Sequence, residues 1–494
     1  MNNGTEHRGN GAPGRVGPPE PVLGEREGPR DECGVFGVWS PEQDVARLAY
    51  FALYALQHRG QESAGIATAD SGHITTLRDL GLVSQVFDER SLQALTGDGA
   101  IGHVRYSTTG GTGWENSQPV YRDDRHAVAL AHNGNLINAV ELYNELTATG
   151  VRFRSTSDSE IIAALCASHP ADSVEDAVTA IMPRLRGAYS TVILTEGSIV
   201  AFRDPAGVRP LCLGELNERY VVASESCALD IIGAQLLREV QPGELISISE
   251  RGIETRQVVT SERQALCVFE HIYFSRPDTQ LEGRTLQSVR GRMGEILARE
   301  APVEADLVVA VPDSGNAAAK GFARGSGIAQ DDGLIKNRYV ARTFIQPGQE
   351  LRRHGLRMKF NPLPEVVAGK RLVVVDDSIV RGNTMRQIVG MLREAGATEV
   401  HLRMSSPPIR HPCHYGIDMP TAEEMAAHDK TVEQISTDLN ADSLAYLSLE
   451  GVYEAVGSSR DTHCDACFTG QYPLEGTESA NGKHALEDLA VVRS

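Results

Sequence analysis

The chain lacks any apolar run long enough to span a membrane, and residues 1–32 lack the apolar segment of a secretory signal peptide. Positive charge is also scarce, because 47 Lys and Arg stand against 66 Asp and Glu, for a formal net charge of −19. This balance argues against nonspecific attraction to nucleic acid or to an anionic membrane, and leaves small anionic ligands open. These absences favour a cytoplasmic protein that binds neither nucleic acid nor membrane.

Cysteine is scarce as well, with eight in 494 residues. That number is too low for a disulfide scaffold in a chain of this length. In a reducing compartment the thiols are therefore expected to serve chemistry or to fill the core. Only Cys464 and Cys467, in "CDAC", have the local spacing of metal ligands.

The chain is long enough for two or three domains with full cores. Residues 1–32 are rich in Gly and Pro and are expected to be disordered, because their few apolar side chains cannot offset the entropy lost on ordering. In residues 33–262 short apolar strands alternate with helices, and one helix is expected over 45–60, ending at Gly60.

A second domain is expected over residues 263–470, and a different pattern runs through it from about residue 283 to 410. Nearly continuous apolar runs end in Asp- and Gly-rich loops that are followed by helices, which is typical of parallel strands in a doubly wound α/β sheet. Residues 415–457 are expected to be helical. Residues 471–494 are expected to form a polar flexible tail.

The most specific local string is "VVVDDSIVRGNT", residues 373–384. A strand delivers two adjacent carboxylates, and a loop of small residues then leads into a helix whose N-terminal N–H groups can hold a phosphate. Paired carboxylates can accept hydrogen bonds from ribose hydroxyls or bind Mg²⁺. The plainer alternative is a strand–turn–helix whose acidic pair only caps the helix.

This string resembles the phosphoribosyl pyrophosphate (PRPP) fingerprint of type I phosphoribosyltransferases. Two further strings are similar to that family: "VPDSGNAAAKGFA" at 311–323 to its pyrophosphate loop, and "KNRYVARTFIQP" at 336–347 to its closing loop. The resemblance implies that Mg²⁺ binds to Ser314, Asp376 and Asp377. The implied PRPP ligands are Asp313, Ser314, Gly315, Lys336, Arg342, Asp376, Asp377, Ser378, Gly382 and Thr384.

Cys33 marks the point where the leader gives way to an apolar strand, "CGVFGVW". A cysteine at a mature N-terminus has its own general base, because its α-amino group has a pKa of about 7.7–8.0 and can take the thiol proton. Inside a chain the same nitrogen is a non-basic amide. Cleavage between Glu32 and Cys33 would therefore create a catalyst. The alternative is a disordered terminus followed by a strand with a buried cysteine.

Three other strings of this region fit glutamine as a substrate. Arg105 suits a carboxylate, Asn133 and the Gly134 N–H suit an oxyanion hole, and Asp158 suits an α-ammonium group. Taken singly, Arg105 could be a surface ion pair, Asn133 a turn residue and Asp158 part of a helix start, where the sequence predicts a capping box from Ser157 to Glu160.

Together these residues resemble the motifs of N-terminal-nucleophile glutamine amidotransferases. The resemblance implies a nucleophile at Cys33, an oxyanion hole at Asn133 and Gly134, and glutamine binding by Arg105 and Asp158. It also implies an α+β domain of four αββα layers, with two stacked antiparallel sheets between helices. "LQHRGQESAG", residues 56–65, is a further string of this family, to which we assign no chemistry.

Four cysteines have positions that could converge: Cys267, Cys413, Cys464 and Cys467. Spacing alone leaves open four unrelated buried cysteines or a zinc site, although zinc sites usually show two local pairs. The strings around them are similar to the ligand positions of amidophosphoribosyltransferases that carry a [4Fe–4S] cluster.

In combination, the chain resembles the amidophosphoribosyltransferase family. The resemblance implies the first step of purine synthesis, in which PRPP, glutamine and water give 5-phosphoribosylamine, glutamate and pyrophosphate. It also implies a homotetramer inhibited by purine nucleotides, and Tyr106 is our candidate for a link between PRPP binding and glutaminase activity. Two alternatives are an amidotransferase with another acceptor and a PRPP-sensing regulator without transfer activity. The PRPP string argues against the first; Cys33 and the negative charge argue against the second.

Overall fold

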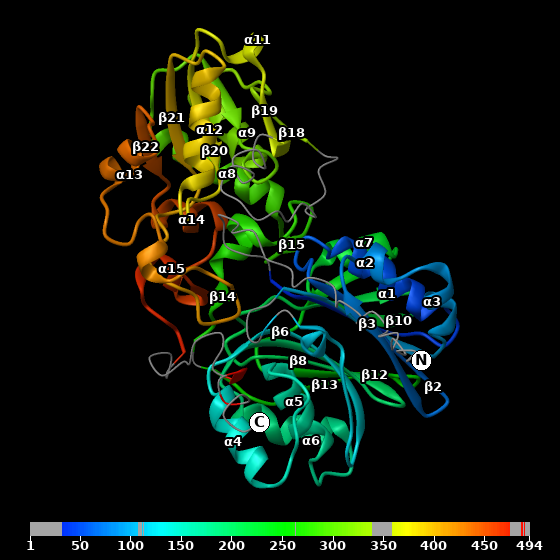
Figure 1. Ribbon diagram of the computed structural model, residues 1–494. Helices are drawn as coiled ribbons and strands as arrows, with labels where there is room; N and C mark the ends of the chain where they lie inside the picture. Colours follow the sequence, from blue (N-terminus) through cyan, green and yellow to red (C-terminus); the bar gives the residue numbers. More distant parts are fainter. Residues whose placement is uncertain are drawn as a thin grey trace, which may run out of the picture.

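The first half of the chain forms two antiparallel sheets that pack face to face (Figure 1). The computed structural model describes residues 32–106, 111, 113–261, 263–337, 358–474, 486, 487 and 489. The seven-stranded sheet has the order β11 (Gln235–Glu239), β9 (Cys212–Leu216), β10 (Arg219–Ala223), β1 (Gly34–Trp39), β4 (Gly99–Arg105), β2 (Ser63–Asp70), β3 (His73–Leu80). The six-stranded sheet has the order β13 (Gly252–Gln257), β12 (Glu244–Ser249), β8 (Ser198–Arg203), β7 (Gly187–Leu194), β6 (Ala127–Leu136), β5 (Val120–Asp123).

Helices cover the outer faces of both sheets. The seven-stranded sheet packs against α1 (Val45–Ala55), α2 (Val83–Val86), α3 (Glu89–Ala94) and α7 (Ser226–Ile231). The six-stranded sheet packs against α4 (Ala139–Ala148), α5 (Asp158–Ala167) and α6 (Val174–Ile181). Strand β1 has apolar side chains on both faces, so it can be covered on both sides. Val35 points into the core between the sheets, and Phe36 points toward the α1 side. The four αββα layers expected from the family resemblance are therefore confirmed.

The second half is built on a parallel sheet of order β17 (Leu307–Ala310), β20 (Arg371–Asp376), β21 (Glu399–Met404), β22 (Ser443–Tyr446). One face packs against α8 (Leu286–Glu300), α9 (Asn316–Ser326) and α14 (Leu449–Val456). The other face packs against α12 (Asn383–Glu394) and α13 (Val432–Asp438). Helices on both faces make this a doubly wound α/β fold, as the apolar runs predicted.

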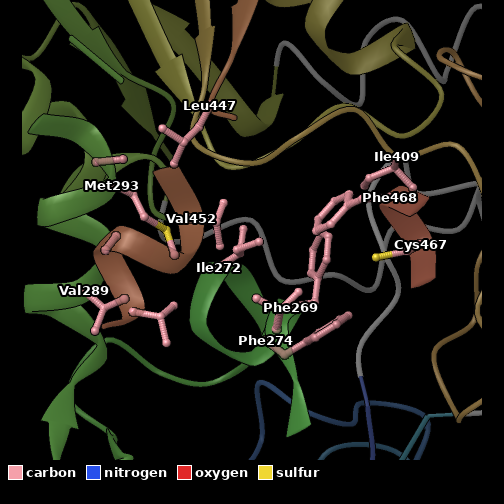
Figure 2. Close-up of a cluster of buried hydrophobic side chains, with 14 of the residues drawn as sticks. Phe269, Ile272, Phe274, Val289, Met293, Ile409, Leu447, Val452, Cys467 and Phe468 are labelled. Carbon is pink, nitrogen blue, oxygen red and sulfur yellow. The ribbon is translucent and has the colours of Figure 1, made fainter. Parts of the chain in front are cut away.

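Smaller elements lie between the two halves. They include β14 (Leu266–Cys267) paired with β23 (His463–Cys464), the hairpin of β15 (Gln280–Leu281) and β16 (Arg284–Thr285), a π-helical turn at Glu270–Phe274, and α15 (Ala466–Thr469). Beside the parallel sheet, β18 (Leu334–Lys336) pairs with β19 (Phe360–Pro362), which precedes α11 (Pro364–Val367). Figure 2 shows Phe269 and Phe274 packed with Phe468 near Cys467, so this region has an aromatic core of its own.

The structure corrects three expectations about local elements. The helix expected over 45–60 ends at Ala55, and the Gln57 side chain donates to the Gly60 carbonyl in the turn that follows. The segment 415–457 is not helical throughout, because β22 supplies the fourth parallel strand between α13 and α14. The capping box is also wrong: Ser157 caps α5 through the Ser159 N–H, and Glu160 accepts from the N–H groups of residues 154 and 155.

Two described points of the C-terminal segment contact the rest of the protein. The Tyr472 hydroxyl donates to the Pro412 carbonyl at 2.6 Å. Leu486 is buried against the helices over the six-stranded sheet. Within the described ranges, no helix combines the length and the apolar character that crossing a membrane requires.

Candidate functional site

Cys33 lies directly before β1 and is buried. Its thiol donates a hydrogen bond to the Tyr106 carbonyl at 3.4 Å, and its own carbonyl accepts from the Arg59 Nε at 3.1 Å. Burial is the main cause that raises the pKa of the Cys33 thiol, to about 11, and the Tyr106 hydrogen bond and the Arg105 charge only partly oppose it. At pH 7 about one thiol in 10⁴ is then ionised, so Cys33 is a poor nucleophile while it is joined to Glu32.

Strand pairing brings charged side chains to the same end of the sheet as Cys33. Gly34 pairs with Val104, so Cys33 and Arg105 lie at adjacent ends of β1 and β4. Arg105 is buried and donates to the Gly111 carbonyl at 3.1 Å. Its Nη1 atom lies 3.9 Å from a carboxylate oxygen of Glu62. A buried guanidinium beside the thiol can bind a substrate carboxylate.

Asp158 is the first residue of α5 and is buried. Its Oδ2 atom accepts from the Leu136 N–H at 2.9 Å, and this bond ties the helix to the end of β6. The charges of Arg105, Glu62 and Asp158 all act on the Cys33 thiol, so the structure brings these residues together. The region therefore places a cation and carboxylates around one thiol. An amino acid substrate needs such charges, a cation for its carboxylate and a carboxylate for its ammonium group.

Asn133 and Gly134 lie on β6, in the sheet that faces β1. The Asn133 side chain is fully buried, and neither its Nδ2 nor its Oδ1 has a hydrogen-bond partner among the described residues. A buried amide without a partner is costly, so its retention points to a ligand that completes it. Gly134 has a φ of 147°, and a Cβ there would lie 2.0 Å from the Ala188 oxygen, so the position requires glycine.

The second site lies at the carboxyl ends of β17 and β20, which pair in parallel. Asp376 and Asp377 are both buried there, and the Ser314 hydroxyl donates to Asp376 Oδ1 at 3.0 Å. Burial, and then the neighbouring Asp377 charge, raise the pKa of Asp376 well above its ordinary value. Burial also raises the pKa of Asp377. Oxygen ligands in this number and spacing suit Mg²⁺, whose charge would offset the cost of two buried carboxylates.

The loop after Asp377 leads into a helix, as the string at 373–384 predicted. Ser378 follows at once and its hydroxyl donates to Asp377. Gly382 has a φ of 85° and is the N-cap of α12, and Thr384 lies in the first turn of that helix. The first N–H groups of α12 are therefore available to a phosphate.

The loop after β17 lies against this one. Gly315 is the N-cap of α9, and a Cβ on it would lie 2.3 Å from the Val375 oxygen. Asp313 is exposed in the same loop and forms an ion pair with Lys336 at the end of β18. The structure thus brings Lys336 to the expected pyrophosphate loop. Arg342 and most of the expected closing loop lie outside the described residues.

The four candidate cluster cysteines converge. Cys267 and Cys464 are register partners of β14 and β23, Cys467 lies in α15, and Cys413 accepts from the Tyr415 N–H at 3.3 Å. None of the four forms a disulfide within the described residues, and burial raises the pKa of each thiol. Each of Cys267, Cys413 and Cys464 also acts on the pKa of Cys467, as neighbouring charges do.

The spacing of these four sulfur atoms is wider than a single-metal site requires. No three of them lie within 4.8 Å of one another. Four thiolates around one zinc ion, with Zn–S bonds of about 2.3 Å, would be closer than that. The arrangement suits a larger inorganic core, such as an iron–sulfur cluster.

Sequence reasoning missed a buried ionic cluster that joins the two halves. The Arg59 guanidinium contacts Glu32 and Glu270 at 2.8 Å each and also pairs with Glu225. Arg209 pairs with Glu32 and donates to the Tyr415 carbonyl. The string "LQHRGQESAG", to which no chemistry was assigned, supplies Arg59.

A segment of the second half also contacts β6 directly. The Asn135 amide donates to the His414 carbonyl at 2.9 Å. A Cβ on Gly416 would lie 2.8 Å from the Gly134 carbonyl carbon, which shows how closely the two backbones approach. Residues 413–416 therefore link Cys413 to the strand that carries Asn133.

Comparison with known proteins agrees with this arrangement. A family model described as a glutamine amidotransferase domain matches residues 103–230. The chain is 51% identical to the amidophosphoribosyltransferase of Mycobacterium tuberculosis over 475 residues, 93% of this chain and 90% of the relative. It is 52% identical to that of Synechocystis over 480 residues, 95% of this chain and 97% of the relative.

A solved structure extends the likeness to three dimensions. It is that of the glutamine PRPP amidotransferase from B. subtilis complexed with ADP and GMP, which is 46% identical. The match has a TM-score of 0.87 and covers 92% of this chain and all of the other. The fold, the two sites and these likenesses lead to one conclusion: the chain belongs to the amidophosphoribosyltransferase family.

Proposed function

We propose that the chain converts PRPP, glutamine and water into 5-phospho-β-D-ribosylamine, glutamate and pyrophosphate, with glutamine hydrolysed at Cys33 and ammonia used at Asp376 and Asp377. As a member of its family the chain is a glutamine amidotransferase and pentosyltransferase of purine biosynthesis. Ammonia released into bulk water would be protonated and lost, so we place its path inside the protein. An acceptor other than PRPP and a non-enzymatic regulator are not favoured.

The glutaminase step begins with cleavage of the bond between Glu32 and Cys33. The freed α-amino group takes the thiol proton, and the thiolate attacks the side-chain amide of glutamine. Arg105 holds the substrate carboxylate and Asp158 its ammonium group. The Asn133 amide and the Gly134 N–H stabilise the oxyanion of the tetrahedral intermediate, after which ammonia leaves and water hydrolyses the thioester.

The observation that carries this proposal is the unpartnered amide of Asn133. It is fully buried in the sheet that faces Cys33, and neither polar atom is satisfied within the described part of the chain. A structural asparagine in that position would be expected to make hydrogen bonds. If the Asn133 amide donates to the oxyanion that forms during the reaction, its lack of hydrogen-bond partners in the absence of substrate is explained.

In the transfer step, Asp376 and Asp377 hold the ribose hydroxyls, and Ser378, Gly382 and Thr384 hold the 5′-phosphate at the start of α12. Asp313, Ser314 and Gly315 hold the pyrophosphate, with Lys336 and Arg342 as cations beside it. Mg²⁺, bound to Ser314, Asp376 and Asp377, would stabilise negative charge on the leaving pyrophosphate.

The sulfur spacing supports a [4Fe–4S] cluster on Cys267, Cys413, Cys464 and Cys467, with a structural role. We also propose that the enzyme is cytoplasmic, since eight cysteines in 494 residues are too few for a disulfide scaffold. The related B. subtilis structure was solved with ADP and GMP, which supports purine nucleotides as inhibitors of this chain too. We also propose a homotetramer.

The test separates the two half-reactions. Cys33→Ala should abolish phosphoribosylamine formation from glutamine and retain formation from added ammonia. Asp376→Asn should lose both, because the transfer site serves either nitrogen source. Loss of the ammonia reaction in a folded Cys33→Ala protein, or its survival in Asp376→Asn, would contradict this division of labour.

A further inference from the structure

Three side chains outside both sites converge near the junction of the two halves: His271, Glu282 and His463. The Nε2 atoms of His271 and His463 lie 3.2 and 3.1 Å from the same oxygen, Oε2 of Glu282. The three ligand atoms all lie within 4.8 Å of one another, and no other group of three or more His, Cys, Asp or Glu in the described ranges does so.

The three residues come from three different elements. His271 belongs to the π-helical turn at Glu270–Phe274, and Glu282 to the turn between β15 and β16, where it has a φ of 49°. His463 is the first residue of β23, directly before Cys464. Both imidazoles are almost wholly buried, whereas the Glu282 side chain is 29% exposed, so an ion could enter beside it.

Hydrogen bonding fixes which nitrogen of His463 carries a proton. Its Nδ1 atom lies 3.2 Å from the Ser459 carbonyl and 3.0 Å from the Thr462 hydroxyl oxygen. A carbonyl oxygen can only accept a hydrogen bond, so the contact with Ser459 requires a hydrogen on Nδ1, and the Thr462 hydroxyl donates to the same carbonyl at 2.8 Å. Nδ1 therefore carries the hydrogen, and in neutral imidazole the Nε2 lone pair faces the Glu282 carboxylate.

A lone pair and a carboxylate 3.1 Å apart repel each other unless a proton or a cation lies between them. Donation of the outer N–H to a backbone carbonyl is how metal-bound histidines are usually oriented. His271 is buried as well, its Nδ1 has no hydrogen-bond partner within the described residues, and its Nε2 faces the same Glu282 oxygen at 3.2 Å.

We propose that His271, Glu282 and His463 bind a divalent transition metal, with Zn²⁺ as its occupant. Two imidazole nitrogens and one carboxylate oxygen are a common zinc ligand set, and water would complete the tetrahedron. Bonds of about 2.0–2.1 Å at tetrahedral angles separate ligand atoms by about 3.3 Å, close to the distances to Glu282. The Ser458 hydroxyl donates to the same Oε2 atom at 3.3 Å and would orient the carboxylate.

The position gives this metal a structural role. It would join β23, the π-helical turn and the β15–β16 hairpin, and β23 carries Cys464 in register with Cys267 of β14. The ion would thus hold β23, and with it the candidate cluster ligand Cys464, against the π-helical turn and the β15–β16 hairpin. The site goes beyond the proposed reaction, since none of its residues belongs to either active site.

The test measures metal directly on the full-length protein, purified anaerobically and equilibrated with micromolar Zn²⁺. We expect one zinc per chain in addition to any iron, and only nitrogen and oxygen neighbours in X-ray absorption at the zinc edge. Glu282→Gln should weaken zinc binding at least tenfold while iron content and ammonia-dependent transfer are retained. His271→Gln should have the same effect.

The matched control is Glu399→Gln, because Glu399 also contacts a histidine, His401, at 2.9 Å but has no second histidine in reach. It should bind zinc like the unaltered protein. Three results would overturn the proposal: no zinc taken up, sulfur neighbours around the zinc, or unchanged zinc affinity in Glu282→Gln. The X-ray absorption spectrum of the unaltered protein tests the proposed zinc ligands even if a variant fails to fold.

Discussion

At the scale of single residues, two features keep the Cys33 thiol protonated while its nitrogen belongs to a peptide bond. Burial raises its pKa to about 11, and the Tyr106 carbonyl accepts its hydrogen. Neither is a general base. The thiol therefore lacks a general base. Hydrolysis of the peptide bond before Cys33 would supply one, because it frees an amine within reach of the sulfur.

The raised pKa predicts how fast iodoacetamide alkylates Cys33 at each pH. In the uncleaved chain the thiolate fraction, and with it the rate, should keep rising up to a pH of about 11. At pH 7 we expect the uncleaved chain to react at least tenfold more slowly than a chain that begins at Cys33. Peptide mass spectrometry measures the rate, intact mass verifies the cleavage state, and the urea-unfolded chain is the reference. Equal rates at pH 7 would refute the argument.

Asn133 allows a second prediction at this scale. Asn133→Ala should lower kcat for the glutamine-dependent reaction by about 10²–10³-fold, as loss of an oxyanion donor does. The ammonia-dependent reaction should be unchanged, since the transfer site is separate. Asn144→Ala, an exposed asparagine on α4, is the control and should alter neither assay. A glutamine reaction unaffected by Asn133→Ala would remove the amide from the mechanism.

At the scale of elements, the sequence predicts best where one pattern is continuous. The apolar runs before Asp313 and Asp376 predicted the parallel strands β17 and β20, because a strand buried on both faces must be apolar throughout. The strand β22 was missed, since its residues lie between two helical patterns and pair only in the folded sheet. The end of α1 was misplaced for a related reason. Arg59, in the turn after the helix, forms buried ion pairs with carboxylates that are distant in sequence, and the local pattern does not show them.

The contact between residues 413–416 and β6 predicts the effect of a single methyl group. Gly416 has a φ of 101°, and a Cβ there would lie 2.8–3.0 Å from the backbone of Gly134. Gly416→Ala should therefore destabilise the protein by about 1–3 kcal/mol and displace β6. We expect a lower urea midpoint and a larger loss in the glutamine-dependent than in the ammonia-dependent reaction.

Gly390→Ala is the matched control for this prediction. Gly390 lies in α12, where a Cβ would meet nothing within 4 Å. Alanine in the interior of a helix should stabilise the protein by up to about 1 kcal/mol. If Gly416→Ala left the urea midpoint unchanged, the close approach of the two backbones would not be a constraint in solution.

At the scale of the whole molecule, individual motifs were predictable and their coupling was not. Asp376 and Asp377 are adjacent in sequence and act within one loop, so a local string was sufficient to find them. In the ionic cluster of Glu32, Arg59 and Glu270, the Arg59–Glu270 pair alone joins residues 211 positions apart, and no local pattern signals it. His271 and Glu282 escaped notice for the same reason, since His463 reaches them only when β23 pairs with β14.

Cys413 lies where the coupling of the two halves can be tested. Its thiol is one of the four candidate cluster ligands, and the residues that follow it contact Asn135 and Gly134. If a cluster fixes this segment, Cys413→Ser should lower the iron content from about four atoms per chain to less than one. It should also reduce the glutamine-dependent reaction more than the ammonia-dependent one, because β6, which carries Asn133, loses its support.

Iron analysis and the two activity assays on anaerobically purified protein measure this effect. Cys166→Ala is the control, because Cys166 is buried in α5 among apolar side chains and should leave the iron content unchanged. Full iron content in Cys413→Ser would exclude Cys413 as a ligand. Loss of iron with both reactions intact would show instead that the segment holds its place on β6 through its backbone contacts alone, since the His414 carbonyl and Gly416 do not depend on the thiol.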